Sequence, residues 1–203
     1  MKISTSHRAL ALAAALLLTA SLAYGQGEAT AARELSLSGF GMGTGTYTGI
    51  NGSRNIAFTA GFDLGLHPIG SIRPEIELRG TEPVDSGGIV GEKNALGGVK
   101  FTGFLNSRLH PYGDILIGRG KMNYAGTGYV VGNVAYQYTS SMVYAFGGGA
   151  DYDLTDHFAL KADYQMQRWL TPVTTSGAAY PMAISFGVVY RINIGRLPRG
   201  KQR

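Results

Sequence analysis

Strict alternation of apolar and polar residues is the feature that most constrains the fold of this chain. Its clearest run places large apolar residues at every second position, namely Met182, Ile184, Phe186, Val188, Tyr190 and Ile192. Successive side chains of a β-strand point to opposite faces, so this segment has one large apolar face. A second run alternates Ile72, Pro74, Ile76 and Leu78 with Arg73, Glu75, Glu77 and Arg79. Four charges on one face suit either a solvated surface or the polar interior of a barrel in lipid.

The alternation predicts eight strands, most of them long enough for a tilted crossing of a bilayer. They cover residues 34–46, 55–67, 72–81, 94–106, 112–124, 138–151, 157–169 and 182–194. Short connections (68–71, 107–111, 152–156) alternate with long ones (47–54, 82–93, 125–137, 170–181). Outer-membrane barrels have short periplasmic turns and long external loops, so we expect both termini on the periplasmic side.

The first residues predict export. Lys2, His7 and Arg8 precede an apolar run from Ala9 to Ala20, which is typical of a secretory signal peptide and too short to span a bilayer as a helix. Small residues place cleavage after Ala23 or Gly25. We therefore divide the chain into a signal peptide (1–25), a short segment (26–33), a barrel (34–194) and a basic periplasmic tail (195–203).

Composition argues against a disulfide-stabilised protein and against a nucleic-acid-binding protein. The chain has no cysteine, so disulfides do not stabilise it. Its 18 Lys and Arg against 13 Asp and Glu give a basic balance, but six of the basic residues lie in the signal peptide and the tail. The barrel itself is nearly neutral and has no basic stripe for nucleic acid. The alternative to an outer-membrane barrel is a soluble barrel of the lipocalin type, which requires the large apolar face to point inward.

Two local patterns give further expectations. Most of the tyrosines and the tryptophan fall near predicted strand ends, as in an aromatic girdle at headgroup depth; they include Tyr112, Tyr124, Tyr138, Tyr152, Tyr164, Trp169, Tyr180 and Tyr190. In the first strand, Leu35 and Leu37 have one parity whereas Phe40 and Met42 have the other. This change predicts a bulge or an irregular pairing with the last strand.

Several motifs resemble the small eight-stranded bacterial outer-membrane β-barrel proteins, a group that includes the OmpA transmembrane domain and opacity-type surface proteins. The likeness rests on Pro111-Tyr112-Gly113, on the runs 147–154 and 155–164, and on the terminal Val189-Tyr190-Arg191. It implies an all-β, antiparallel up-and-down transmembrane barrel in the bacterial outer membrane. The implied partners are outer-membrane lipid and lipopolysaccharide, periplasmic chaperones and the barrel-assembly machinery. Family members often end in an aromatic residue, whereas this chain continues through Arg196 to Arg203.

By parity, the interior of the barrel holds a polar network in which the two signs of charge nearly balance. Its charged members are Asp63, Arg73, Glu75, Glu77, Arg79, Lys100, Asp151, Lys161, Asp163 and Arg191, with Gln165 and Gln167 alongside. Balanced charge in so narrow a lumen predicts a plug of ion pairs, in which Lys100, Lys161 and Asp163 face the charges of the third strand. A narrow, gated small-solute pore remains the alternative.

The sequence does not support a phosphate-binding loop, a lipid-modifying active site or a metal site. The run 195–201 has P-loop spacing, but Gln202 replaces the Ser or Thr and no helix follows. A lipid-modifying enzyme needs a histidine near the long loops, whereas His67, His110 and His157 fall at the short turns. Their spacing makes no metal site, and we expect no cofactor. The sequence therefore predicts a non-catalytic surface protein with a structural role or an extracellular ligand for its loops.

Overall fold

The computed structural model describes residues 35–85, 90–124 and 128–194. The predicted signal peptide, the segment 26–33 and the basic tail lie outside these residues. No helix in the described part of the chain is long and apolar enough to cross a membrane.

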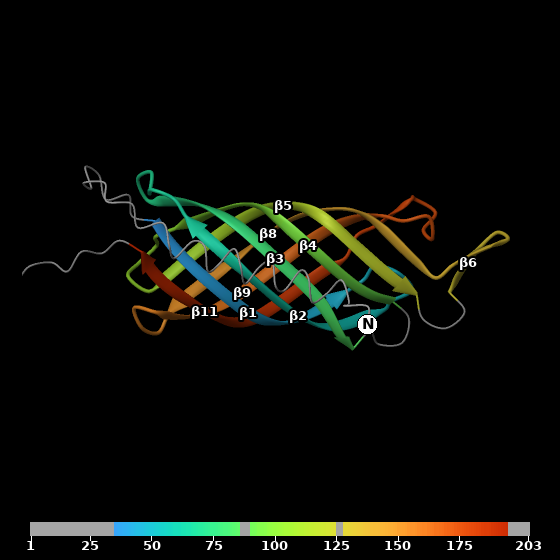
Figure 1. Cartoon of the computed structure of the whole chain (residues 1–203), viewed down its shortest axis with the longest axis horizontal. Coiled ribbons are helices and arrows are strands. Elements are labelled where there is room, and N and C mark those ends of the chain that lie inside the picture. Colours follow the sequence, from blue (N-terminus) through green and yellow to red (C-terminus); the bar gives the residue numbers. More distant parts are fainter. Residues whose placement is uncertain (1–34, 86–89, 125–127, 195–203) are drawn as a thin grey trace, which may run out of the picture. The chain divides into compact units, whose positions relative to one another are not determined.

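The described residues form long strands joined by turns. The strands are β1 (Leu35–Tyr47), β2 (Arg54–Gly65), β3 (Ile72–Asp85), β4 (Val90–Gly103), β5 (Leu109–Tyr124), β6 (Tyr129–Val131), β7 (Val134–Tyr136), β8 (Tyr138–Asp153), β9 (Phe158–Leu170), β10 (Ala178–Ala179) and β11 (Met182–Ile194). The eight long ones are tilted against the axis that they surround (Figure 1).

Neighbouring strands are antiparallel, and the sheet closes on itself. β1 pairs with β2 on one side and with β11 on the other, with Leu35 opposite Ile194. β8 bridges β5 and β9, and β9 pairs with β11, so no long strand is left as an edge. The result is an all-β, closed, eight-stranded antiparallel up-and-down barrel, as the alternation predicted.

The irregularity expected in β1 does not occur. β1 keeps one register against both neighbours along its whole length. Phe40 and Met42 point inward, and the outward positions between Leu37 and Tyr47 are glycines. The change of apolar parity therefore reflects small residues on the outside and not a bulge. A register shift occurs instead between Ile56 and Ala57, where β2 meets β3.

The large apolar face of the strands points outward. Phe186 is 66% exposed whereas its neighbour Ser185 is 2% exposed, and the same alternation runs along β2, β3 and β9. A soluble barrel would expose the opposite face. An apolar exterior around a polar interior is the arrangement that a bilayer requires.

The two ends of the barrel differ. Residues 66–71, 104–108 and 154–157 make short turns at the end where β1 begins and β11 finishes. The predicted long connection 82–93 is mostly strand, because β3 continues to Asp85 and β4 begins at Val90. Backbone pairing continues there although the side-chain alternation has stopped. The connection 125–137 contains the β6–β7 hairpin, which extends beyond the ends of the neighbouring strands (Figure 1).

Candidate functional site

The interior of the barrel is the candidate site, and the structure places all ten predicted charged residues inside it. Asp63, Glu75, Glu77, Arg79, Lys100, Asp151, Lys161 and Asp163 are buried. Arg73 and Arg191 are half-buried near the short turns. Each occupies an inward position of its strand, so the period of two carries every one of these charges to the lumen.

Near the short turns, each of two cations contacts two carboxylates from other strands. The Lys100 ammonium lies 2.8 Å from Glu75 of β3 and also contacts Asp63 of β2. Arg191 of β11 contacts Asp153 and lies 3.5 Å from Asp151, both on β8. These pairs link β4 to β2 and β3, and β11 to β8, within the lumen.

Arg79 occupies the centre of the network. Its guanidinium lies 2.8 Å from Asp163 of β9 and 3.4 Å from Asp114 of β5, and it also contacts Glu77 of its own strand. Gln165 donates to Asp114 at 2.9 Å. A planar cation with several donors suits such multiple contacts. Because β3, β5 and β9 lie on different sides of the barrel, this cluster spans the lumen, and we call Glu77, Arg79, Asp114 and Asp163 the ion-pair plug.

Aromatic rings complete the packing around the plug. The Lys161 ammonium lies 3.6 Å from Asp151, beyond a good hydrogen bond, and sits 4.0 Å from the centre of the Tyr112 ring. The Tyr112 hydroxyl donates to Asp163 at 2.8 Å. A Cβ at Gly149 of β8 would lie 2.6 Å from that hydroxyl, so only glycine leaves room for it. Tyr112 thus belongs to the interior and not to an aromatic girdle.

Sequence reasoning missed three charged residues of the lumen, Asp114, Glu92 and Asp153. Asp114 shares its parity with Leu116, which is also buried, so the inward face of β5 has no clean polar signal. Glu92 lies in the segment that was predicted to be a loop. His110 is also inside, where its Nε2 lies 2.9 Å from Asp153. In each case, extending the parity of β4, β5 or β8 could have found the residue.

A small polar chamber follows the plug toward the long loops. Thr44 exchanges hydrogen bonds with Thr59 at 2.7 Å and with Ser185 at 2.9 Å. The lining also includes Arg79 and Glu92, and the cavity measures about 10 Å³. That volume suits one water molecule and no larger solute.

Glu92 lies at the outermost part of the chamber, next to the exposed Lys93 and beyond the apolar band. Its side chain is buried, and its Oε1 has no hydrogen-bond partner among the described residues. Burial without a facing cation disfavours the charged form and raises the pKa of Glu92 to about 8.

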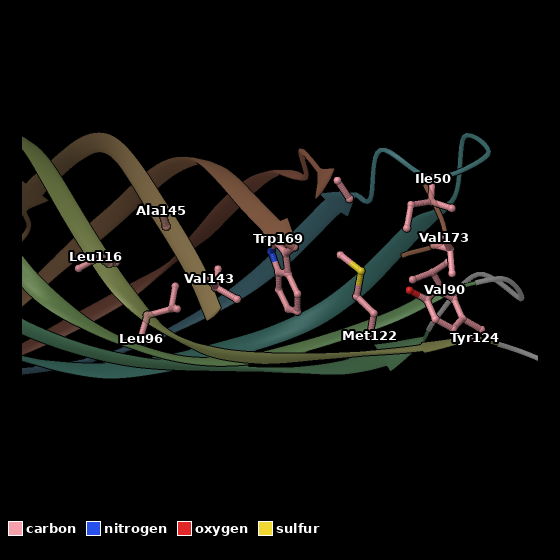
Figure 2. Packing of buried hydrophobic residues seen from close by; sticks show 11 residues of the cluster. Ile50, Val90, Leu96, Leu116, Met122, Tyr124, Val143, Ala145, Trp169 and Val173 are labelled. Carbon is pink, nitrogen blue, oxygen red and sulfur yellow. The ribbon is translucent and has the colours of Figure 1, made fainter. Parts of the chain in front are cut away.

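The end of the lumen near the long loops also holds an apolar cluster, which the predicted polar network did not anticipate. Figure 2 shows the cluster extending from Leu116 and Ala145, past Trp169, to Ile50 and Val173 of the loops. Trp169 is 1% exposed, and its indole nitrogen donates to Gln167 at 2.8 Å. The terminal atoms of its ring occupy the space that a Cβ at Gly120 would need.

The cluster corrects the predicted girdle at two further positions. Trp169 and Tyr124 point into the lumen. There each ring packs against apolar side chains, and its polar atom forms a hydrogen bond. The girdle residues that do point outward are Tyr138, Tyr152, Tyr164, Tyr180 and Tyr190. Two groups of buried side chains thus occupy the lumen, the ion-pair plug and the apolar cluster under the loops.

The site shows no centre for metal chemistry. In residues 35–85, 90–124 and 128–194, no three His, Cys, Asp or Glu side chains are grouped so that they could hold a metal ion. The three carboxylates of the plug instead form ion pairs with Arg79.

Comparison with solved structures gives a similar fold at low sequence identity. The structure of Neisserial surface protein A superimposes with a TM-score of 0.50 and 13% identity, over 79% of this chain and 97% of that chain. This chain has the fold of a small outer-membrane β-barrel. Two further matches are the attachment invasion locus protein Ail of Yersinia pestis (TM-score 0.47, 14% identity, 79% and 99% covered) and the outer membrane protein OprG of Pseudomonas aeruginosa (TM-score 0.48, 10% identity, 80% and 98% covered). No family model and no curated protein matches the barrel sequence.

Proposed function

We propose that this barrel is a bacterial outer-membrane protein with a closed lumen, whose role is structural or lies in contacts made by its loops, and which is not an enzyme. The observation that carries this proposal is the ion-pair plug. Arg79 is buried against three carboxylates from three strands, and the apolar cluster closes the same passage a second time. A selective channel normally carries one sign of charge around a constriction that remains open.

The location rests on the outward apolar face and on the fold. In that setting the short turns and both termini face the periplasm, and the β6–β7 hairpin faces the exterior. Its partners are then outer-membrane lipid and lipopolysaccharide, with periplasmic chaperones and the barrel-assembly machinery during biogenesis. The loops carry any extracellular ligand.

Conductance tests the closed lumen. Wild-type protein in a planar bilayer should show little or no steady current. Glu77→Ala removes one of the three carboxylates around Arg79, and Lys100→Ala leaves Asp63 and Glu75 without their cation. Either change should destabilise the barrel or open it intermittently. A large and stable current through the wild type would contradict the proposal and support the small-solute pore.

A lipid-modifying enzyme is disfavoured by the position of the histidines. His67 and His157 lie in short turns, and His110 pairs with Asp153 at the same end. A base that activates a serine against an outer-leaflet lipid would have to lie at the opposite end. Hydrolysis or acyl transfer by the purified protein on outer-membrane lipid would overturn this argument.

A further inference from the structure

The outward charges of the strands gather at one end of the barrel. Within the described residues, the charged side chains on outward strand positions are Arg54, Glu82, Lys93, Arg119, Lys121 and Arg168. All of them lie toward the long loops, and only Glu82 is acidic. The outward strand positions toward the short turns are apolar or uncharged in the same part of the chain. The exterior is therefore basic at one end only.

Three of these cations form a compact group on β4 and β5. Lys93 is directly opposite Lys121, and Arg119 follows two residues along the same face, opposite Ala95. Side chains directly opposite in an antiparallel pair have Cβ atoms about 5 Å apart, and like charges there repel one another. We call Lys93, Arg119 and Lys121 the outer basic patch.

The patch has too few anions of its own. Lys93 lies 3.3 Å from Glu82, but the two side chains are 44% and 69% exposed, so water weakens the pair. Lys121 lies 4.2 Å from the centre of the Tyr138 ring. Arg119 makes no ion pair with any described residue. One acid for three cations leaves a site that attracts an external anion.

The position of the patch indicates which anion it meets. Ile115 and Ile117 continue the outward face of β5 below Arg119, and both are exposed. A ligand that covers both parts needs apolar chains attached to a phosphate. Arginine binds phosphate through two parallel hydrogen bonds, and lysine does so as a point charge.

We infer that Lys93, Arg119 and Lys121 bind a phosphate of lipid A in the outer leaflet, with its acyl chains packed along β5. This inference rests on the proposed outer-membrane location, because the long loops must face outward for the patch to meet that leaflet. Outward charge restricted to one end of the barrel matches a membrane in which one leaflet carries the phosphorylated glycolipid.

The test measures lipid binding to the intact mature protein in neutral detergent by native mass spectrometry. Wild type should bind lipid A, and K93Q/R119Q/K121Q should bind it at least about tenfold more weakly. R119Q alone should lose part of the affinity for lipid A. This single variant keeps the inference testable if the triple variant folds poorly. E82Q should bind more tightly, because the competing carboxylate is gone. R108Q changes an exposed arginine in a short turn and should bind as wild type does.

Binding of two further lipids shows whether the patch recognises the phosphates of lipid A or any anionic lipid. Lipid A without its phosphates should bind wild type and the triple variant equally weakly. Phosphatidylglycerol should bind wild type more weakly than lipid A does; equal affinity would overturn the assignment to lipid A. Unchanged lipid A affinity in a folded triple variant would overturn the patch itself. Neither result affects the proposed function, which conductance and surface labelling test separately.

Discussion

Replacing Arg79 by methionine tests whether the lumen is truly desolvated. The change keeps a long side chain but removes the cation that Glu77, Asp114 and Asp163 share. Breaking a buried ion pair by removing one partner typically costs about 3 to 5 kcal/mol, because the remaining charge is left uncompensated. Here three carboxylates lose a common partner, so we expect the upper part of that range. Such a loss is a large share of a total stability of about 5 to 15 kcal/mol.

Urea unfolding in phosphatidylcholine vesicles measures this loss. Trp169 is the single tryptophan and is buried in the apolar cluster, so its fluorescence reports on the barrel interior. The control is Lys93→Met, which removes a cation from an exposed pair and should cost less than about 1 kcal/mol. R79M/D163N should cost less than the sum of its single changes by about 0.5 to 3 kcal/mol, because the two residues contact each other.

The refuting result is specific. If Arg79→Met costs no more than Lys93→Met, water must reach the plug and screen its charges. The ion pairs would then not close the lumen, and the argument for a non-conducting barrel would lose its main support.

Three other predictions test facing, topology and pH dependence. Phe186→Arg puts a charge on the outer face and should cost about 2 to 4 kcal/mol in lipid; unchanged stability there would mean that the outer face does not meet lipid, and Ser185→Arg, facing inward, provides the comparison. A cysteine at the exposed Ala135 should react with an impermeant maleimide on intact cells, whereas one at Asp156 should not, and labelling of the second alone would invert the topology. Because burial raises the pKa of Glu92 to about 8, the folded state binds more protons than the unfolded state between its ordinary pKa and about 8, so stability falls as pH rises through that window. Glu92→Gln should flatten this fall in unfolding experiments from pH 5 to pH 8, and an unchanged slope would refute the role of Glu92.

Much of the architecture follows from the sequence because the period of two is a local property. The outward apolar residues from Met182 to Ile192 and the four charges from Arg73 to Arg79 were assignable from parity alone, since a strand cannot turn one side chain without turning the rest. The same rule carried Asp63, Lys100 and Lys161 to the lumen without knowledge of their partners.

The tertiary structure decided what parity leaves open, which is the contact between strands far apart in the sequence. Parity gives Arg79 an inward direction, but only closure of the barrel brings it between Asp114 and Asp163. Trp169 shares the inward parity of Gln165 and Gln167, but its position near a strand end also fitted a girdle. Only the tertiary structure shows the apolar space that Gly120 and the loop residues Ile50 and Val173 leave for Trp169 and Tyr124. The alternation therefore determined which face each side chain occupies, whereas the space and charge available across the lumen determined what each one meets there.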